Sequence, residues 1–128
     1  MSASDGHRHH GIDYLELVAP DLTAVKEFYH SAFGWTFTDY GDDYCGFSDG
    51  RSHDGAPLEA GGFMRGAPVQ GGPLVVLFSS ALEATRDAVA KAGGRITKDI
   101  FPFPGGRRFE FEDPAGNRLA AWSHERSR

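Results

Sequence analysis

Two segments of the chain have the hydrophobic spacing of an amphipathic helix. Apolar side chains recur every three or four positions in LTAVKEFYHSAFG (residues 22–34) and, more sparsely, in LEATRDAVAKAGG (residues 82–94). Asp21 stands where a helix cap is expected, and Ser80 with Glu83 has the spacing of a capping box. Both segments end in glycine, which favours helix termination. We expect these stripes, with two residues of a later strand, to be buried: Leu22, Val25, Phe28, Phe33, Leu82, Val89, Phe109 and Phe111.

The two helical segments align at a separation of 60 residues, with Leu22 on Leu82 and Gly34 on Gly94. Strand patterns flank both of them. IDYLELV precedes the first helix, and WTFTDY, DYCGFSD and PLEAGGFM follow it. PLVVLFS precedes the second helix, and RITKDIF, RRFEFED and NRLAAWS follow it. Because PLVVLFS is apolar throughout, we expect that strand to be buried on both faces. Each half therefore predicts a strand–helix–strand–strand–strand (βαβββ) module, and the repetition indicates duplication.

Composition limits the class of protein. With 128 residues there is room for one domain, which we place at 11–123 with flexible tails at 1–10 and 124–128. A formal charge of −5 argues against a nucleic-acid partner. No apolar run is long enough for a membrane helix, and the N-terminal segment lacks the apolar stretch of a secretory signal. Cys45 is the single cysteine, so an internal disulfide is excluded and we expect a cytoplasmic location.

The order of these elements, with three motifs, resembles the vicinal oxygen chelate superfamily of glyoxalases, bleomycin resistance proteins and extradiol dioxygenases. The motifs are APDLTAVKEFYHSAFGW, AKAGG and FEDPAGNRLAAW. The resemblance covers nearly the whole chain. It implies an α+β fold in which two βαβββ modules, about 11–64 and 73–123, form a curved sheet around a cleft. It also implies a homodimer, since related proteins of one domain commonly cover their clefts with a second chain.

The resemblance further implies four metal-ligand positions, usually occupied by His or Glu. These fall here on Tyr14, on its repeat mate Leu74, on Ala120, and on Ala60 or Gly62. A single phenol is a poor ligand set for a divalent ion, which needs several fixed donors. We therefore predict that this protein has no metal site and no cofactor. Metal-dependent glyoxalase or dioxygenase activity is not expected.

Strand alternation identifies the residues expected to line the cleft. If Tyr14 faces it, so does Glu16. If Ala120 faces it, so do Arg118 and Trp122. The resemblance places a functional polar side chain at Glu110. The full candidate set for ligand binding is Tyr14, Glu16, Phe78, Arg108, Glu110, Arg118 and Trp122.

Each candidate has a structural alternative. The charged residues Glu16, Arg108, Glu110 and Arg118 would also suit ion pairs between neighbouring strands. Phe78 and Trp122 would also suit the hydrophobic core.

The sequence favours one function and leaves two alternatives. The favoured one is binding of a small molecule in a metal-free cleft, for sequestration or sensing. The main alternative is a lyase or isomerase that uses Glu110 or Glu16 as general base, with or without a metal. The third is an interaction module without any ligand, which would have its cleft filled by side chains.

Overall fold

The computed structural model describes residues 7, 9–10, 12–69 and 71–124. Its first module contains β1 (Leu15–Ala19), α1 (Leu22–Phe33), β2 (Thr36–Asp39), β3 (Tyr44–Ser48) and β6 (Gly61–Arg65). The strand order is β1-β6-β3-β2, with β1 parallel to β6 and the other pairs antiparallel. Two short strands, β4 (Ser52–His53) and β5 (Ala56–Pro57), form a separate hairpin.

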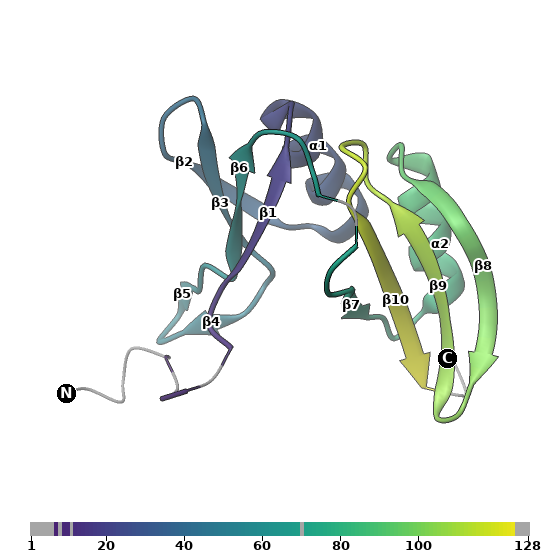
Figure 1. Cartoon of the computed structure of the whole chain (residues 1–128). Coiled ribbons are helices and arrows are strands. Elements are labelled where there is room, and N and C mark those ends of the chain that lie inside the picture. Colours follow the sequence, from purple (N-terminus) through teal and green to yellow (C-terminus); the bar gives the residue numbers. More distant parts are fainter. Residues whose placement is uncertain (1–6, 8, 11, 70, 125–128) are drawn as a thin grey trace.

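The second module repeats this topology. It contains β7 (Val75–Phe78), α2 (Leu82–Lys91), β8 (Arg95–Phe103), β9 (Gly106–Glu112) and β10 (Arg118–His124), in the order β7-β10-β9-β8. The predicted α+β fold with two βαβββ modules is confirmed (Figure 1). The predicted C-terminal tail begins one residue too early, because His124 pairs with Gly106 as the last residue of β10. The predicted tail residues 1–6, 8 and 125–128 lie outside the described residues.

The ends of the helices agree with the sequence in one module and differ in the other. Asp21 caps α1 by accepting a hydrogen bond of 3.2 Å from the backbone of Ala24. The prediction of a capping box at Ser80 is wrong, because the N-cap residue of α2 is Ala81 and no side chain caps this helix. Ser79 takes over part of that role, since its Oγ accepts from the Ala81 backbone at 3.0 Å.

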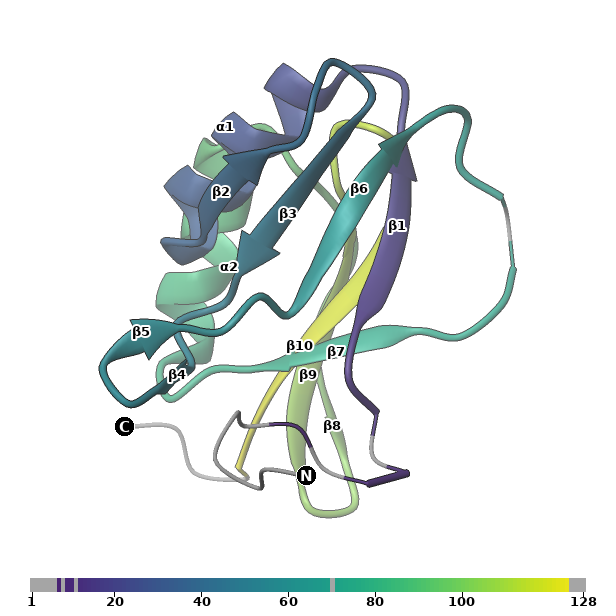
Figure 2. The same cartoon turned by 90° about the vertical axis from the view of Figure 1, so that its left-hand side faces the viewer.

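One hydrophobic core joins the two modules. Val25, Phe28, Leu82, Val89, Phe109 and Phe111 are buried as predicted, while Leu22 and Phe33 are partly buried at its margin. Across the modules, the rings of Phe28 and Phe111 lie 6.2 Å apart. The helices α1 and α2 contact each other and lie on one side of the molecule, with a sheet diverging from each (Figures 1 and 2).

Each sheet uses one face for this core and leaves the other face open. In β1, Leu17 and Ala19 belong to the core or pack against it, so Glu16 lies on the opposite face. The expectation that residues 73–79 are buried on both sides is wrong. Val76 is 42% and Phe78 54% exposed, because the outer face of β7 has no layer above it. Neither helix of the described chain is long and apolar enough to cross a membrane.

Candidate functional site

The open face of the first sheet carries phenols and carboxylates. Tyr14 precedes β1, Glu16 lies within it, and Tyr44 begins β3. Tyr40 and Glu59 join them from loops, through the contacts described below. We call this surface the N-terminal wall, formed by Tyr14, Glu16, Tyr40, Tyr44 and Glu59.

The phenols of the N-terminal wall form hydrogen bonds with its carboxylates. The hydroxyls of Tyr14 and Tyr44 lie 2.8 Å apart, and Tyr44 donates to Glu16 at 3.1 Å. Glu59 accepts from Tyr14 at 3.4 Å and from Tyr40 at 2.8 Å. Burial raises the pKa of Tyr14 and Tyr44, and the hydrogen bond to Glu59 raises the pKa of Tyr40. The three phenols are therefore neutral at physiological pH.

Gly62 makes this arrangement possible. A Cβ at this position would lie 2.4 Å from the Tyr44 hydroxyl and 2.7 Å from the Tyr14 hydroxyl. The two phenols therefore lie over a strand position that has no side chain.

The sequence did not lead us to three residues of this wall: Tyr40, Tyr44 and Glu59. Tyr44 could have been predicted from strand alternation. Its neighbour Cys45 is buried, so Tyr44 lies on the opposite, open face of the strand.

The second sheet brings the other five candidates together on its open face. Register places Ala120 opposite Glu110 and Trp122 opposite both Arg108 and Phe78. The same register adds Lys98, which is opposite Glu110 on β8. We call this surface the C-terminal wall, and its functional candidates are Phe78, Lys98, Arg108, Glu110, Arg118 and Trp122.

Two arginines hold Glu110 on the C-terminal wall. Arg108 donates to one carboxylate oxygen at 2.8 Å and Arg118 to the other at 3.0 Å. Burial opposes ionisation of Glu110, but the hydrogen bonds from Arg118 and Arg108 outweigh it, and its pKa is lowered. The cross-strand ion pairs considered as an alternative are thus present for these three residues. A carboxylate with a lowered pKa is a weak general base.

The aromatic residues of this wall are open to solvent to different degrees. Phe78 and Trp122 meet edge to face with ring centres 5.3 Å apart. Phe78 is more than half exposed and is therefore not a core residue, whereas Trp122 is half-buried. Ala120, which lies between Arg118 and Trp122 on the same face of β10, is fully buried and has no exposed surface of its own.

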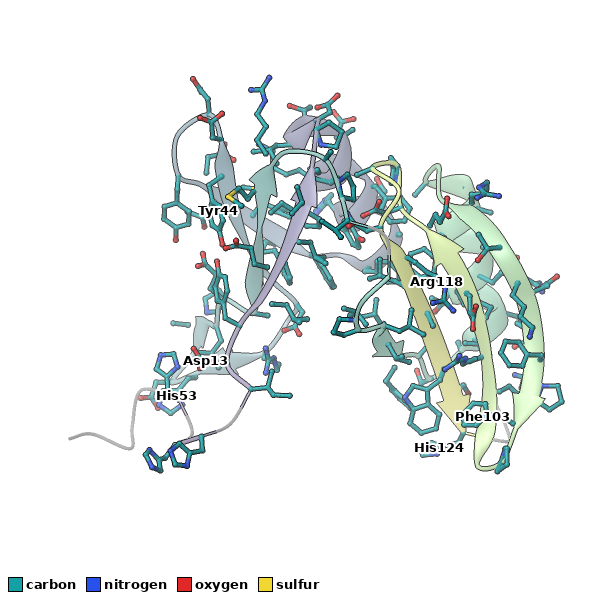
Figure 3. All side chains as sticks on the ribbon, viewed as in Figure 1. Asp13, Tyr44, His53, Phe103, Arg118 and His124 are labelled. Atoms are coloured by element: carbon teal, nitrogen blue, oxygen red, sulfur yellow. The ribbon has the colours of Figure 1, made fainter. Side chains whose placement is uncertain are left out.

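The two walls lie on different sheets, and within the chain their candidates do not gather in one cleft, apart from Glu16 and Arg118. Figure 3 shows Tyr44 on the first sheet and Arg118 on the second, on separate arms of the molecule. Where the modules meet, Glu16 and Arg118 line one cavity of about 320 Å³, together with Asn117 and Leu74. Asn117 helps to fix this junction by donating to the backbone oxygen of Val18 at 2.9 Å.

The four positions implied as metal ligands do not fit a metal ion. Register on the first sheet places Gly62 beside Glu16, whereas Ala60 belongs to the core. Leu74 and Ala120 have no donor atoms in their side chains, and the phenol of Tyr14 is already bonded within the N-terminal wall. No group of three or more His, Cys, Asp or Glu residues suited to a metal occurs in the part of the chain that the structure describes.

Residues 11–121 match the family model of the Glyoxalase/Bleomycin resistance protein/Dioxygenase superfamily. The chain belongs to this superfamily. The match covers both modules and confirms the resemblance inferred from the motifs. No curated protein matches the sequence.

Solved structures of the superfamily share the fold at low sequence identity. A glyoxalase-related enzyme from Fulvimarina pelagi is 18% identical with a TM-score of 0.70, over 91% of this chain and 89% of that one. A mutant of the fosfomycin resistance protein FosX from Listeria monocytogenes, complexed with Mn(II) and 1S,2S-dihydroxypropylphosphonic acid, is 17% identical with a TM-score of 0.71, over 92% and 91%. A glyoxalase I mutant from Zea mays is 21% identical with a TM-score of 0.67, over 87% of this chain and 45% of that one. These similarities establish the fold and no activity.

Proposed function

We propose that this protein binds a small molecule without a metal ion, for sequestration or sensing. The observation that carries this proposal is the contrast between the four metal-ligand positions and the walls around them. The positions supply one phenol, Tyr14, which is engaged by its neighbours. The walls nevertheless present charged and aromatic side chains to solvent, among them Arg118 and Phe78. Such a surface is suited to recognition of a ligand and poorly suited to Lewis-acid chemistry.

We propose in addition that the binding cleft forms between two copies of the chain. The N-terminal and C-terminal walls both face away from the shared core, so within one chain neither wall is covered by the other. Apolar side chains are exposed on both sheets, with Met64 at 44% and Phe78 at 54%. In a twofold homodimer each N-terminal wall would face the C-terminal wall of the partner, which gives two identical clefts.

Base catalysis receives less support than binding. The lowered pKa of Glu110 keeps it ionised but makes it a poor proton acceptor. Glu16 is exposed and accepts a hydrogen bond from Tyr44. An effective base at neutral pH requires both burial and a raised pKa. Glu110 has a lowered pKa, and Glu16 is not buried.

A ligand screen on metal-free protein tests the proposed function. The chain is dialysed against EDTA and mixed with a library of small metabolites and drugs, and binding is detected by thermal shift and ligand-observed NMR. We expect binders whose affinity and thermal shift are unchanged when Zn²⁺, Ni²⁺, Mn²⁺ or Fe²⁺ is added. Binding that appears only after addition of a metal would contradict the proposal, and so would a screen in which nothing binds to either wall.

A further inference from the structure

The C-terminal wall has an excess of positive charge, although the chain as a whole is acidic. Register and contacts place four cationic and two anionic side chains on this face: Arg95, Lys98, Arg108, Arg118, Glu110 and Glu112. The wall therefore has two more positive than negative charges, whereas the whole chain has a formal charge of −5. This separation of charge indicates that the wall attracts an anion.

The excess is concentrated around Glu110. At one end of the wall Arg95 and Glu112 neutralise each other at 2.9 Å. Of the remaining cations, Arg108 and Arg118 pair with the carboxylate of Glu110, and Lys98 lies opposite Glu110 in the strand register. In the described part of the chain Lys98 has no carboxylate within ion-pair distance, and its ammonium group lies 4.2 Å from the ring centre of Phe101.

The arginines retain hydrogen-bond donors for a second anion. A guanidinium group has five N–H donors, and Arg118 uses one in its recorded bond to Glu110. The Nε of Arg108 is buried and has no hydrogen-bond partner among the described residues. A buried donor without a partner is costly, so an acceptor from a ligand at this point would be stabilising. The side chain of Arg118 is 55% exposed, so its remaining donors are accessible.

Apolar rings lie next to these donors. Trp122 pairs across the strands with Arg108 on one side and with Phe78 on the other, and the small Ala120 precedes it on the same face. A ligand whose anionic group meets the two guanidinium groups can therefore place a planar apolar part against Phe78 and Trp122. Arginine and aromatic side chains together are well suited to such a molecule.

From this juxtaposition we infer that the ligand is a small aromatic or planar anion, bound through Arg108 and Arg118 and packed against Phe78 and Trp122. The inference rests on the proposed function, because it names the ligand chemistry of the same cleft. The carboxylates of the N-terminal wall belong to the other side of the cleft, so the anionic group is directed to the C-terminal wall.

Three isosteric probes of different charge test this inference. Phenylacetate, phenylacetamide and phenylacetamidine share one ring and one shape and carry a negative, a zero and a positive charge. Each is titrated into ¹⁵N-labelled protein, and the indole N–H signal of Trp122, assigned with Trp122→Phe, reports binding. We expect phenylacetate to bind at least about tenfold more tightly than the other two, a difference of about 1.4 kcal/mol. Its affinity should fall as salt is added.

Two variants, each of which removes one arginine charge from the second sheet, provide the matched comparison. Arg118→Gln should remove the preference for phenylacetate. Arg107→Gln removes the same charge from β9 but on the other face, where Arg107 pairs with Glu83 at 2.7 Å, and it should keep the preference. Equal or tighter binding of the amide or amidine, or no shift with phenylacetate, would overturn the inference. In either case the proposed function stands if the library screen yields neutral or cationic binders on these walls, and it fails separately if that screen yields none.

Discussion

The hydroxyl of Tyr29 on α1 donates a hydrogen bond of 2.8 Å to the carboxylate of Asp113, in the turn between β9 and β10. Both side chains are buried. Asp113 also accepts hydrogen bonds from the backbone of Ala115 and from Asn117, so one carboxylate organises the turn and links it to the other module. This contact helps to fix the modules with their helices together and their open faces apart.

Removing the Tyr29 hydroxyl should weaken the junction between the modules. We expect Tyr29→Phe to cost about 1–3 kcal/mol of unfolding free energy at neutral pH, because a buried acceptor loses its donor. Burial and the neighbouring Asp113 raise the pKa of Tyr29 well above its usual 10.0. The stabilisation is therefore fully present below that usual value and is lost as the pH rises through the raised pKa.

Urea denaturation of both proteins from neutral to alkaline pH measures this effect. The difference in stability between wild type and Tyr29→Phe should shrink as the pH rises. Tyr40→Phe is the control, because Tyr40 is 55% exposed and its loss should change stability little. A stability difference that is independent of pH would contradict the role assigned to the Tyr29 hydroxyl.

The assignment of buried and open faces can be tested with two Phe→Ala substitutions. Phe28 is buried between the modules, so Phe28→Ala should cost about 3–5 kcal/mol. Phe78 lies on an open face at 54% exposure, so Phe78→Ala should have a much smaller effect on the stability of the single chain. Chemical denaturation gives both values, and similar losses for the two variants would show that the assignment of core and open faces is wrong.

The sequence predicted the fold better than the site, and Phe78 shows why. Helical periodicity and the repeat depend on the spacing of residues along the chain, which can be seen in a single sequence. They correctly placed Phe28 and Val89 in the core. The apolar run containing Phe78 was expected to be buried on both faces. Burial depends on which layers cover a strand, and local spacing does not record that.

The candidate site shows the same limit. Alternation correctly grouped Arg118 with Trp122, because both lie on one strand. It could not determine that Tyr14 and Glu16 belong to a different wall, since that depends on how the modules pack. Tyr40 and Glu59 come from loops, where no periodicity applies, so their contact was not predictable from the sequence.

The ion pairs of Glu110 predict a specific dependence of stability on pH. The lowered pKa means that its stabilising contribution is present above the usual value of 4.5 and is lost as the pH falls through the lowered pKa. Glu110→Gln should therefore be less stable than wild type at neutral pH, because it leaves two arginines without their carboxylate. The difference should disappear in acid.

Thermal unfolding of both proteins across the acidic range tests this prediction. Glu112→Gln is the matched control, because Glu112 lies two residues away on the same face and pairs with the well-exposed Arg95. Its effect should be smaller than that of Glu110→Gln at neutral pH. If Glu110→Gln proves as stable as wild type at neutral pH, the ion pairs contribute nothing and the account of this wall needs revision.

The central claim is that the N-terminal wall of one chain faces the C-terminal wall of another, and paramagnetic relaxation in a mixed dimer tests it most directly. A spin label is attached to Met64→Cys on the open face of the first sheet, in unlabelled (¹⁴N) protein that also carries Cys45→Ala. This protein is mixed with ¹⁵N-labelled chain that carries no spin label. Every observed signal then comes from a chain without a spin label, and its broadening reports a spin label on the partner. Light scattering first establishes the dimer. The account predicts strong broadening of the Trp122 indole signal, and none with the label at Glu27→Cys on the exposed face of α1. A monomer at all concentrations, or a Trp122 signal unaffected by the label at position 64, would contradict it.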